Sequence, residues 1–88
     1  MSSDIEQIKK RIIYRSNYRG TKEMDKLLGT FTKKYINMLS NDDLNNLEKL
    51  LVIDDNSLYD YYNGTKTKIK FEENYVNLLF KNFKYINE

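Results

Sequence analysis

The chain has 88 residues, a formal net charge of +2, no cysteine and no histidine. A chain of this length makes one small domain, which buries about 60–65% of its unfolded surface. The missing residue types exclude disulfide bridges, cysteine-ligated zinc, thiol nucleophiles and histidine acid–base catalysis. These exclusions favour a binding or assembly role over an enzyme that acts alone.

Charge is distributed unevenly along the chain. Residues 1–38 carry nine Lys and Arg against four Asp and Glu, residues 39–60 carry one against six, and residues 61–88 carry five against three. A basic front and an acidic middle suit an oriented encounter with a protein better than binding to a uniform polyanion. No apolar run reaches the ~20 residues that span a bilayer, and the N-terminus lacks the pattern of a secretory signal. We therefore expect a soluble, cytoplasmic protein.

Isoleucines at helical spacing predict the first helix over about residues 4–17, with Ile5, Ile8 and Ile12 on one face. Gly20 lies just beyond this helix. Glycine enters the left-handed backbone region without the steric penalty of other residues, so Gly20 is predicted to end the helix.

A second helix is predicted directly after this glycine. Thr21 is expected to cap its N-terminus, and Glu23 and Asp25 lie in the first turn, where the helix dipole favours acidic side chains. This stretch has the strongest helical periodicity in the chain. Its apolar stripe predicts a buried face of Met24, Leu27, Leu28, Phe31, Tyr35, Met38 and Leu39.

The middle of the chain predicts two shorter helices. Residues 40–43 read Ser-Asn-Asp-Asp, a turn that also supplies a helix cap. The helix after it is expected to end near Ile53 and to bury Leu44, Leu47, Leu50 and Leu51. Residues 54–57 break this helix and begin a short fourth one, which contains Leu58, Tyr59, Tyr61 and Tyr62 and ends at Asn63-Gly64.

The last helix is predicted to begin after Thr67-Lys68, with one side lined by Phe71, Tyr75, Leu78, Leu79 and Phe83. Short strands over residues 51–53 or 68–71 are an alternative, but both runs are too short to build a sheet. Helices joined by short connections predict an all-α fold, a small compact bundle of about five helices in one domain over residues 1–88.

Four aspartates form the candidate cation site: Asp42, Asp43, Asp54 and Asp55. A calcium loop needs alternating acids, a central glycine and a terminal glutamate, and this pattern is missing here. Helix caps in solvated turns account for the four aspartates better. We therefore predict no metal site.

Two further clusters have both a functional and a structural interpretation. Tyr59, Tyr61 and Tyr62 could stack on bases or on a flavin ring, but aromatic residues on a short helix more often close the end of a core. The basic residues of the first helix could bind phosphates. Only its arginines share one helix row, which favours a row facing solvent or a protein partner. The basic residues are Lys9, Lys10, Arg11, Arg15 and Arg19.

The turn between the first two helices combines a special backbone position with fixed charges, because Arg19 and Gly20 are followed closely by Glu23 and Asp25. In one interpretation Gly20 only ends the helix, and the charges form a local surface pair that contributes little. In the other, the glycine lets a partner approach the backbone while Arg19 offers it a planar fork of N–H donors. The residue types alone leave both open.

Two ordered blocks resemble the flavinylation (FAD assembly) factor family of succinate dehydrogenase, over about residues 12–83. The first block is Arg19-Gly20-x-x-Glu23-x-Asp25 followed by Leu28 and Phe31, and the second is Leu50-Leu51 with Asp54-Asp55-x-x-Leu58-Tyr59-x-Tyr61. The family usually has methionine where Thr21 stands, Asp-Pro where Asp55-Asn56 stands, and tryptophan where Tyr61 stands. Thr21 is the departure expected to weaken an apolar contact with a partner.

The resemblance implies a factor that binds the flavoprotein subunit of succinate dehydrogenase, and in some members that of fumarate reductase, and promotes its covalent attachment of FAD. It implies that FAD belongs to the partner and that this chain has no catalytic residue. The implied partner-binding residues are Arg19, Gly20, Thr21, Glu23 and Asp25, with secondary contacts at Arg15, Asp54 and Asp55.

We expect a monomer that binds no nucleic acid, inserts into no membrane and holds no cofactor stably. The alternatives are an antitoxin-type interaction module, a label that the family has also carried, and a weak nucleic-acid binder. A steep salt dependence of DNA or RNA affinity would distinguish the nucleic-acid binder.

Overall fold

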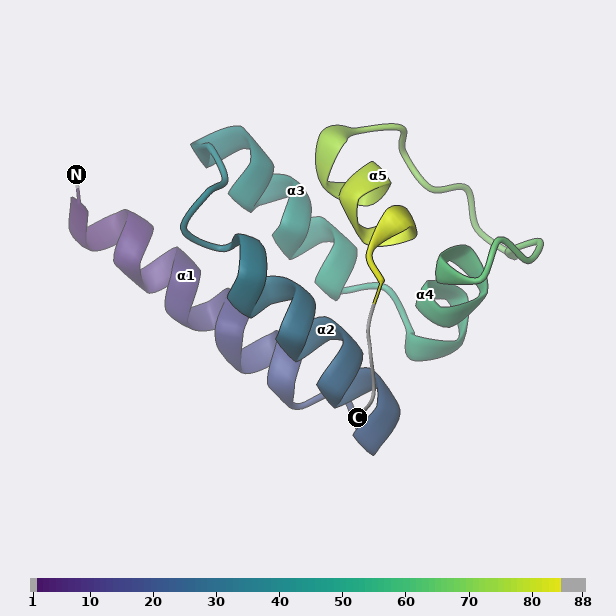
Figure 1. Ribbon diagram of the computed structural model, residues 1–88. Coiled ribbons are helices and arrows are strands. Elements are labelled where there is room, and N and C mark those ends of the chain that lie inside the picture. Colours follow the sequence, from purple (N-terminus) through teal and green to yellow (C-terminus); the bar gives the residue numbers. More distant parts are fainter. Residues whose placement is uncertain (1, 85–88) are drawn as a thin grey trace.

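The computed structural model describes residues 2–84, which form five helices and no strand (Figure 1). They are α1 (Ser2–Asn17), α2 (Lys22–Tyr35), α3 (Asn41–Leu51), α4 (Asp55–Tyr62) and α5 (Tyr75–Asn82). α1 packs against α2 and α3, while α5 packs against α3 and α4. The predicted all-α bundle is confirmed. None of these helices combines the length and the apolarity needed to cross a membrane.

Side-chain caps determine where four of the helices begin. Thr21, Ser40, Asp54 and Asn74 each accept a hydrogen bond from the backbone N–H three residues on. Asp43 completes a capping box, because its carboxylate accepts a hydrogen bond from the backbone N–H of Ser40. Such caps satisfy N–H groups that have no partner within the helix. The predicted caps at Thr21 and Ser40 are therefore confirmed.

The core forms where the two long helices meet α3 and α5. Phe31 of α2 is fully buried, and its ring meets those of Phe80 and Phe83 edge to face, with centroids 5.4 Å apart in each pair. α1 contributes Ile12, which is also fully buried. The predicted buried faces are confirmed at Met24, Leu27, Leu28, Phe31, Leu44, Leu47, Leu50 and Leu51.

The second helix ends earlier than its apolar stripe predicts. α2 stops at Tyr35, and the chain turns through a hydrogen bond from the backbone N–H of Met38 to the carbonyl of Tyr35. Met38 is 73% exposed as a result, and Ile36 is buried in the core instead. Helical spacing continued past the true end by chance, because no glycine or proline marks the stop.

The last helix begins later than predicted, and its buried face differs. α5 starts at Tyr75 because Asn74 caps it, and residues 65–74 before it belong to no helix or strand. Phe71 belongs to this irregular stretch, where its ring stacks on Tyr61 with centroids 4.1 Å apart. Tyr75 and Leu78, predicted to be buried, are 59% and 51% exposed. The residues of α5 that are buried are Val76, Asn77 and Phe80.

A close approach of α1 to α2 sets the geometry of the turn between them. A Cβ atom placed on Gly29 of α2 would lie 2.5 Å from Oδ1 of Asn17, the last residue of α1. Asn17 holds its position by donating a 2.8 Å hydrogen bond to the carbonyl of Ile13. The glycine therefore lets the end of α1 lie directly against α2.

Candidate functional site: the Arg19–Gly20 turn

The Arg19–Gly20 turn joins the antiparallel helices α1 and α2 at one end of the bundle (Figure 1). Gly20 has a backbone φ of +117°. Residues with a Cβ atom rarely adopt this region of backbone conformation. Apart from Gly20 and its two chain neighbours, no atom of residues 2–84 lies within 4 Å of the position that a Cβ would take there. The backbone conformation, rather than lack of space inside the fold, therefore requires glycine. The outer side of the residue is open.

The Arg19 side chain turns inward and is only 10% exposed. Its Nε donates a 2.9 Å hydrogen bond to Oδ1 of Asp55, and Nη2 donates a 2.6 Å hydrogen bond to the carbonyl of Ile53. Nη1 donates to the carbonyl of Leu51. The guanidinium thus fastens the turn to the end of α3 and the start of α4. All three guanidinium nitrogens bond within the chain, so the donor fork faces inward here, and a contact of Arg19 with a partner stays a prediction.

Asp25 supports the turn from the other side. Its carboxylate accepts a hydrogen bond from the backbone N–H of Arg19, and the residue is half-buried. Glu23 is exposed and forms no ion pair within residues 2–84, so the local Arg19–Glu23 pair is absent. The turn consists of an inner support, made of Arg19, Asp25 and Asp55, and an exposed tip, made of Gly20, Thr21 and Glu23.

The arginine row of α1 faces the acidic middle of the chain. Arg11 makes two hydrogen bonds of 3.1 and 3.2 Å to the Glu48 carboxylate of α3, and Arg15 Nη1 lies 3.8 Å from the same group. The hydrogen bond and charge of Glu48 raise the pKa of Arg11 above its ordinary value. Sequence reasoning missed Glu48, although the i, i+4, i+8 arginine row and the acidic middle were the signals for it. Arg15 therefore packs against α3.

Asp54 acts as the N-cap of α4. Its carboxylate accepts a 3.0 Å hydrogen bond from the backbone N–H of Ser57. This N–H, helped by the Ser57 side chain, lowers the pKa of Asp54 below its ordinary value. Within residues 2–84 no group of three or more acidic side chains is placed to hold a metal ion.

The lowered pKa predicts a stability term that disappears in acid. A carboxyl group with a lowered pKa in the folded state stabilises the fold above its unfolded pKa of about 3.9 and loses this effect as pH falls through the folded pKa. Asp54→Asn keeps a capping oxygen but does not titrate. We expect wild type to be more stable than Asp54→Asn at neutral pH, and the two to converge at low pH. Urea unfolding across this pH range measures the difference. Asp54→Ser should behave like Asp54→Asn, and a gap that persists in acid would contradict the assignment.

The family model described as the flavinator of succinate dehydrogenase matches residues 10–84. The chain belongs to this family. The match includes both the exposed tip and the inner support of the turn, and it confirms the resemblance read from the two blocks of residues. No curated protein and no solved structure matches the chain. The flavinator family is one of assembly factors rather than of enzymes.

Two departures from the usual flavinator residues have a local structural role in this chain. Thr21 Oγ1 accepts the 3.2 Å hydrogen bond that caps α2, which a methionine could not do. Tyr61 stacks nearly parallel to Phe71, at an interplanar angle of 8°, and Lys81 Nζ lies 5.4 Å from its ring. Burial raises the pKa of Tyr61, with a smaller effect from Glu73.

The tyrosines of α4 divide between core and surface. The ring of Tyr61 stacks on that of Phe71. The ring centroid of Tyr62 lies 5.3 Å from that of Phe80, and the Tyr62 hydroxyl donates a hydrogen bond to the carbonyl of Phe83. Tyr59 is 45% exposed. The interpretation that this cluster closes the end of the core is confirmed for Tyr61 and Tyr62, and Tyr59 lies at the surface.

Proposed function

We propose that this chain binds the flavoprotein subunit of succinate dehydrogenase and promotes the covalent attachment of FAD to it. Membership of the flavinator family supports a role in attaching flavin to succinate dehydrogenase. The exposed tip of the turn supports a docking site at this place. Gly20, Thr21 and Glu23 are exposed there. Hydrogen bonds of Arg19 and Asp25 hold the backbone of the turn in place. A rigid tip loses little conformational entropy on binding.

The factor acts by favouring one conformation of its partner. The family resemblance implies that FAD belongs to the flavoprotein and bonds to one of its histidines, a residue type that this chain does not contain. A factor that binds the attachment-competent arrangement of the flavoprotein tenfold more tightly than others shifts that equilibrium by about 1.4 kcal/mol. No catalytic side chain on the factor is required for this effect.

The inner support has a separate part in the proposal. Arg19, Asp25 and Asp55 shape the turn, while Glu23 offers the partner a carboxylate that no described cation of this chain neutralises. The same tip would serve the flavoprotein of fumarate reductase if that protein presents a similar surface. We further propose that the factor works as a monomer in the cytoplasm.

Co-expression tests the proposal directly. The flavoprotein is produced with and without this chain, and covalent flavin is measured by fluorescence after a denaturing gel. We expect a several-fold rise in flavin fluorescence per mass of flavoprotein when the chain is present. A flavoprotein whose acceptor histidine is replaced serves as the zero reference. Equal fluorescence with and without the chain would refute the proposed function.

A further inference from the structure

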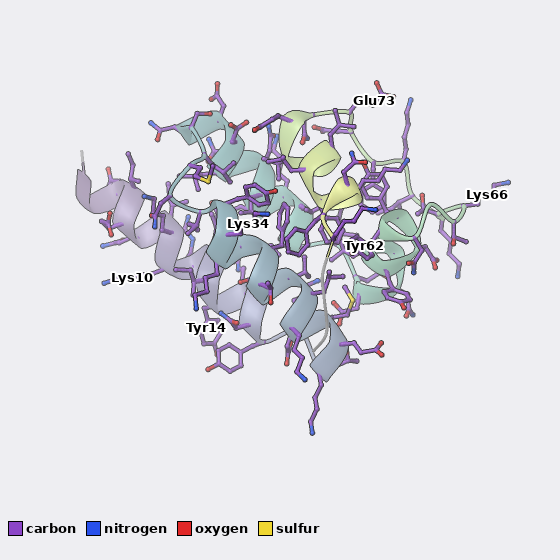
Figure 2. The ribbon with its side chains drawn as sticks, in the orientation of Figure 1. Lys10, Tyr14, Lys34, Tyr62, Lys66 and Glu73 are labelled. Atoms are coloured by element: carbon purple, nitrogen blue, oxygen red, sulfur yellow. The ribbon has the colours of Figure 1, made fainter. Side chains whose placement is uncertain are left out.

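The outer side of α1 carries apolar side chains that the bundle leaves uncovered. Ile13, Tyr14 and Tyr18 are 43%, 65% and 70% exposed. The rings of Tyr14 and Tyr18 touch, with centroids 4.6 Å apart. Figure 2 shows Tyr14 and Lys10 pointing away from α3 and α5. We call Ile13, Tyr14 and Tyr18, together with Lys10, the α1 outer patch.

Two shallow hollows lie along this side of the molecule, one at the patch itself and one on α2. The first is lined by Lys10, Ile13, Tyr14, Asn17 and Tyr18, and the second by Asn17, Asp25, Lys26, Gly29, Thr30 and Lys33. They share Asn17, so they form one continuous face along the outside of the α1–α2 hairpin.

The charge of this face is positive and unbalanced. Lys10, Lys26 and Lys33 are exposed and make no ion pair within residues 2–84. Asp25 is the one acidic residue that lines the hollows, and its carboxylate accepts a hydrogen bond from the backbone N–H of Arg19. The arginines of α1, by contrast, are paired with Glu48 of α3. An acidic surface would complement this face.

We propose that the α1 outer patch and the second hollow bind an acidic segment of the flavoprotein that carries an aliphatic or aromatic side chain for the Tyr14–Tyr18 pair. This inference rests on the proposed function and names a second contact surface for the same partner. Tyr18 immediately precedes Arg19, and Asp25 belongs both to the support of the turn and to the second hollow. The patch therefore adjoins the Arg19–Gly20 turn that carries the tip.

Interface size supports a contact surface larger than the tip. A specific interface buries about 800 Å² on each partner, roughly an eighth of the 6288 Å² that this chain exposes. Three tip residues cannot supply this area, whereas the outer side of the α1–α2 hairpin adjoins them. Tyrosine suits such a role because it offers a large contact area with few rotatable bonds, and it is enriched at protein interfaces.

Binding measurements with matched variants test this surface. The purified full chain is titrated with the flavoprotein at low and at high salt, and flavinylation is measured in parallel. We expect Tyr14→Ser/Tyr18→Ser to raise the Kd about ten- to a hundredfold at both salt concentrations, since hot-spot aromatics carry much of the affinity of an interface. Lys10→Glu/Lys26→Glu should raise the Kd about tenfold at low salt and much less at high salt, because salt screens exposed charges.

The controls carry the same chemistry elsewhere. Met38→Ser/Val52→Ser removes apolar side chains that are 73% and 70% exposed, and Lys66→Glu/Lys70→Glu reverses charges on the loop after α4. Figure 2 shows Lys66 at the far side of the molecule from Lys10. Both control variants should bind like wild type, and unchanged unfolding midpoints would show that all variants fold.

The outcomes separate this inference from the proposed function. A wild-type chain that neither binds the flavoprotein nor raises its covalent flavin overturns both. A wild-type chain that does both, with patch variants of unchanged Kd, overturns only the second surface. Wild-type binding to single-stranded DNA or to anionic vesicles that the patch variants lose, with an unchanged Kd for the flavoprotein, would assign the patch to that other ligand and would likewise overturn the inference.

Discussion

Arg19→Ala is expected to lower the free energy of unfolding by about 2–4 kcal/mol, a large share of the 5–15 kcal/mol typical of a small domain. The substitution removes the partner of Asp55 and leaves the carbonyls of Leu51 and Ile53 without their donors. Buried or half-buried groups that lose their partner each cost about 1–3 kcal/mol. Urea denaturation followed by circular dichroism measures the change.

Two further substitutions show which property of Arg19 matters. Arg19→Lys keeps the charge but loses the planar fork, so an intermediate loss is expected. Arg15→Ala removes an arginine on the same helix row that is 46% exposed and 3.8 Å from its partner, and it should cost less than about 1 kcal/mol. Wild-type stability of Arg19→Ala combined with lost binding would show instead that the guanidinium serves the partner.

Gly20→Arg is expected to reduce covalent flavin in the co-expressed flavoprotein to the amount found without this chain. The new side chain would project from the tip into the space where the proposed function places the flavoprotein, because no described residue other than the chain neighbours of Gly20 lies within 4 Å of the Cβ position. The φ of +117° also strains any residue other than glycine, at a cost of about 1–3 kcal/mol. Flavin fluorescence and the unfolding midpoint are both measured.

Two controls separate the blocked approach from the strain. Gly20→Ala carries a similar backbone strain without the bulk, and it should keep most of the flavinylation at a temperature where the fold persists. Gly64→Arg introduces the same side chain at the other positive-φ glycine, which has φ +76° and equally open surroundings, and it should leave flavinylation intact. Full activity of Gly20→Arg would remove the tip from the proposed interface.

The local features of the fold could be predicted because they depend on residues close together in the chain. The apolar stripe from Met24 to Phe31 recurs every three or four residues, and the caps at Thr21 and Ser40 bond three residues ahead. The start of the last helix could not be predicted in this way. Phe71 and Tyr75 have helical spacing, yet Phe71 lies outside α5 and its ring stacks on that of Tyr61.

The position of the candidate site could be predicted from the sequence. Which of its side chains face the core and which are exposed could not. The Arg19–Gly20 pair, with Glu23 and Asp25 nearby, identified the turn and predicted glycine's special backbone there. Nothing in the residue order indicated that Arg19 faces inward. Its partner Asp55 lies 36 residues away and meets it only after α3 has brought the start of α4 back toward the turn.

Short-range spacing and ordered residue types were enough to predict which stretches are helical, the caps at Thr21 and Ser40, and the family of this protein, but not the end of α2 or the start of α5. The tertiary structure decided which charges remain available to a partner. Arg11, Arg15 and Arg19 are paired by acidic residues 33 to 37 positions distant, whereas Glu23, Lys10, Lys26 and Lys33 are not paired within residues 2–84. Charge pairing depends on distance in space, which packing sets, and so the binding surface could be located only on the folded chain.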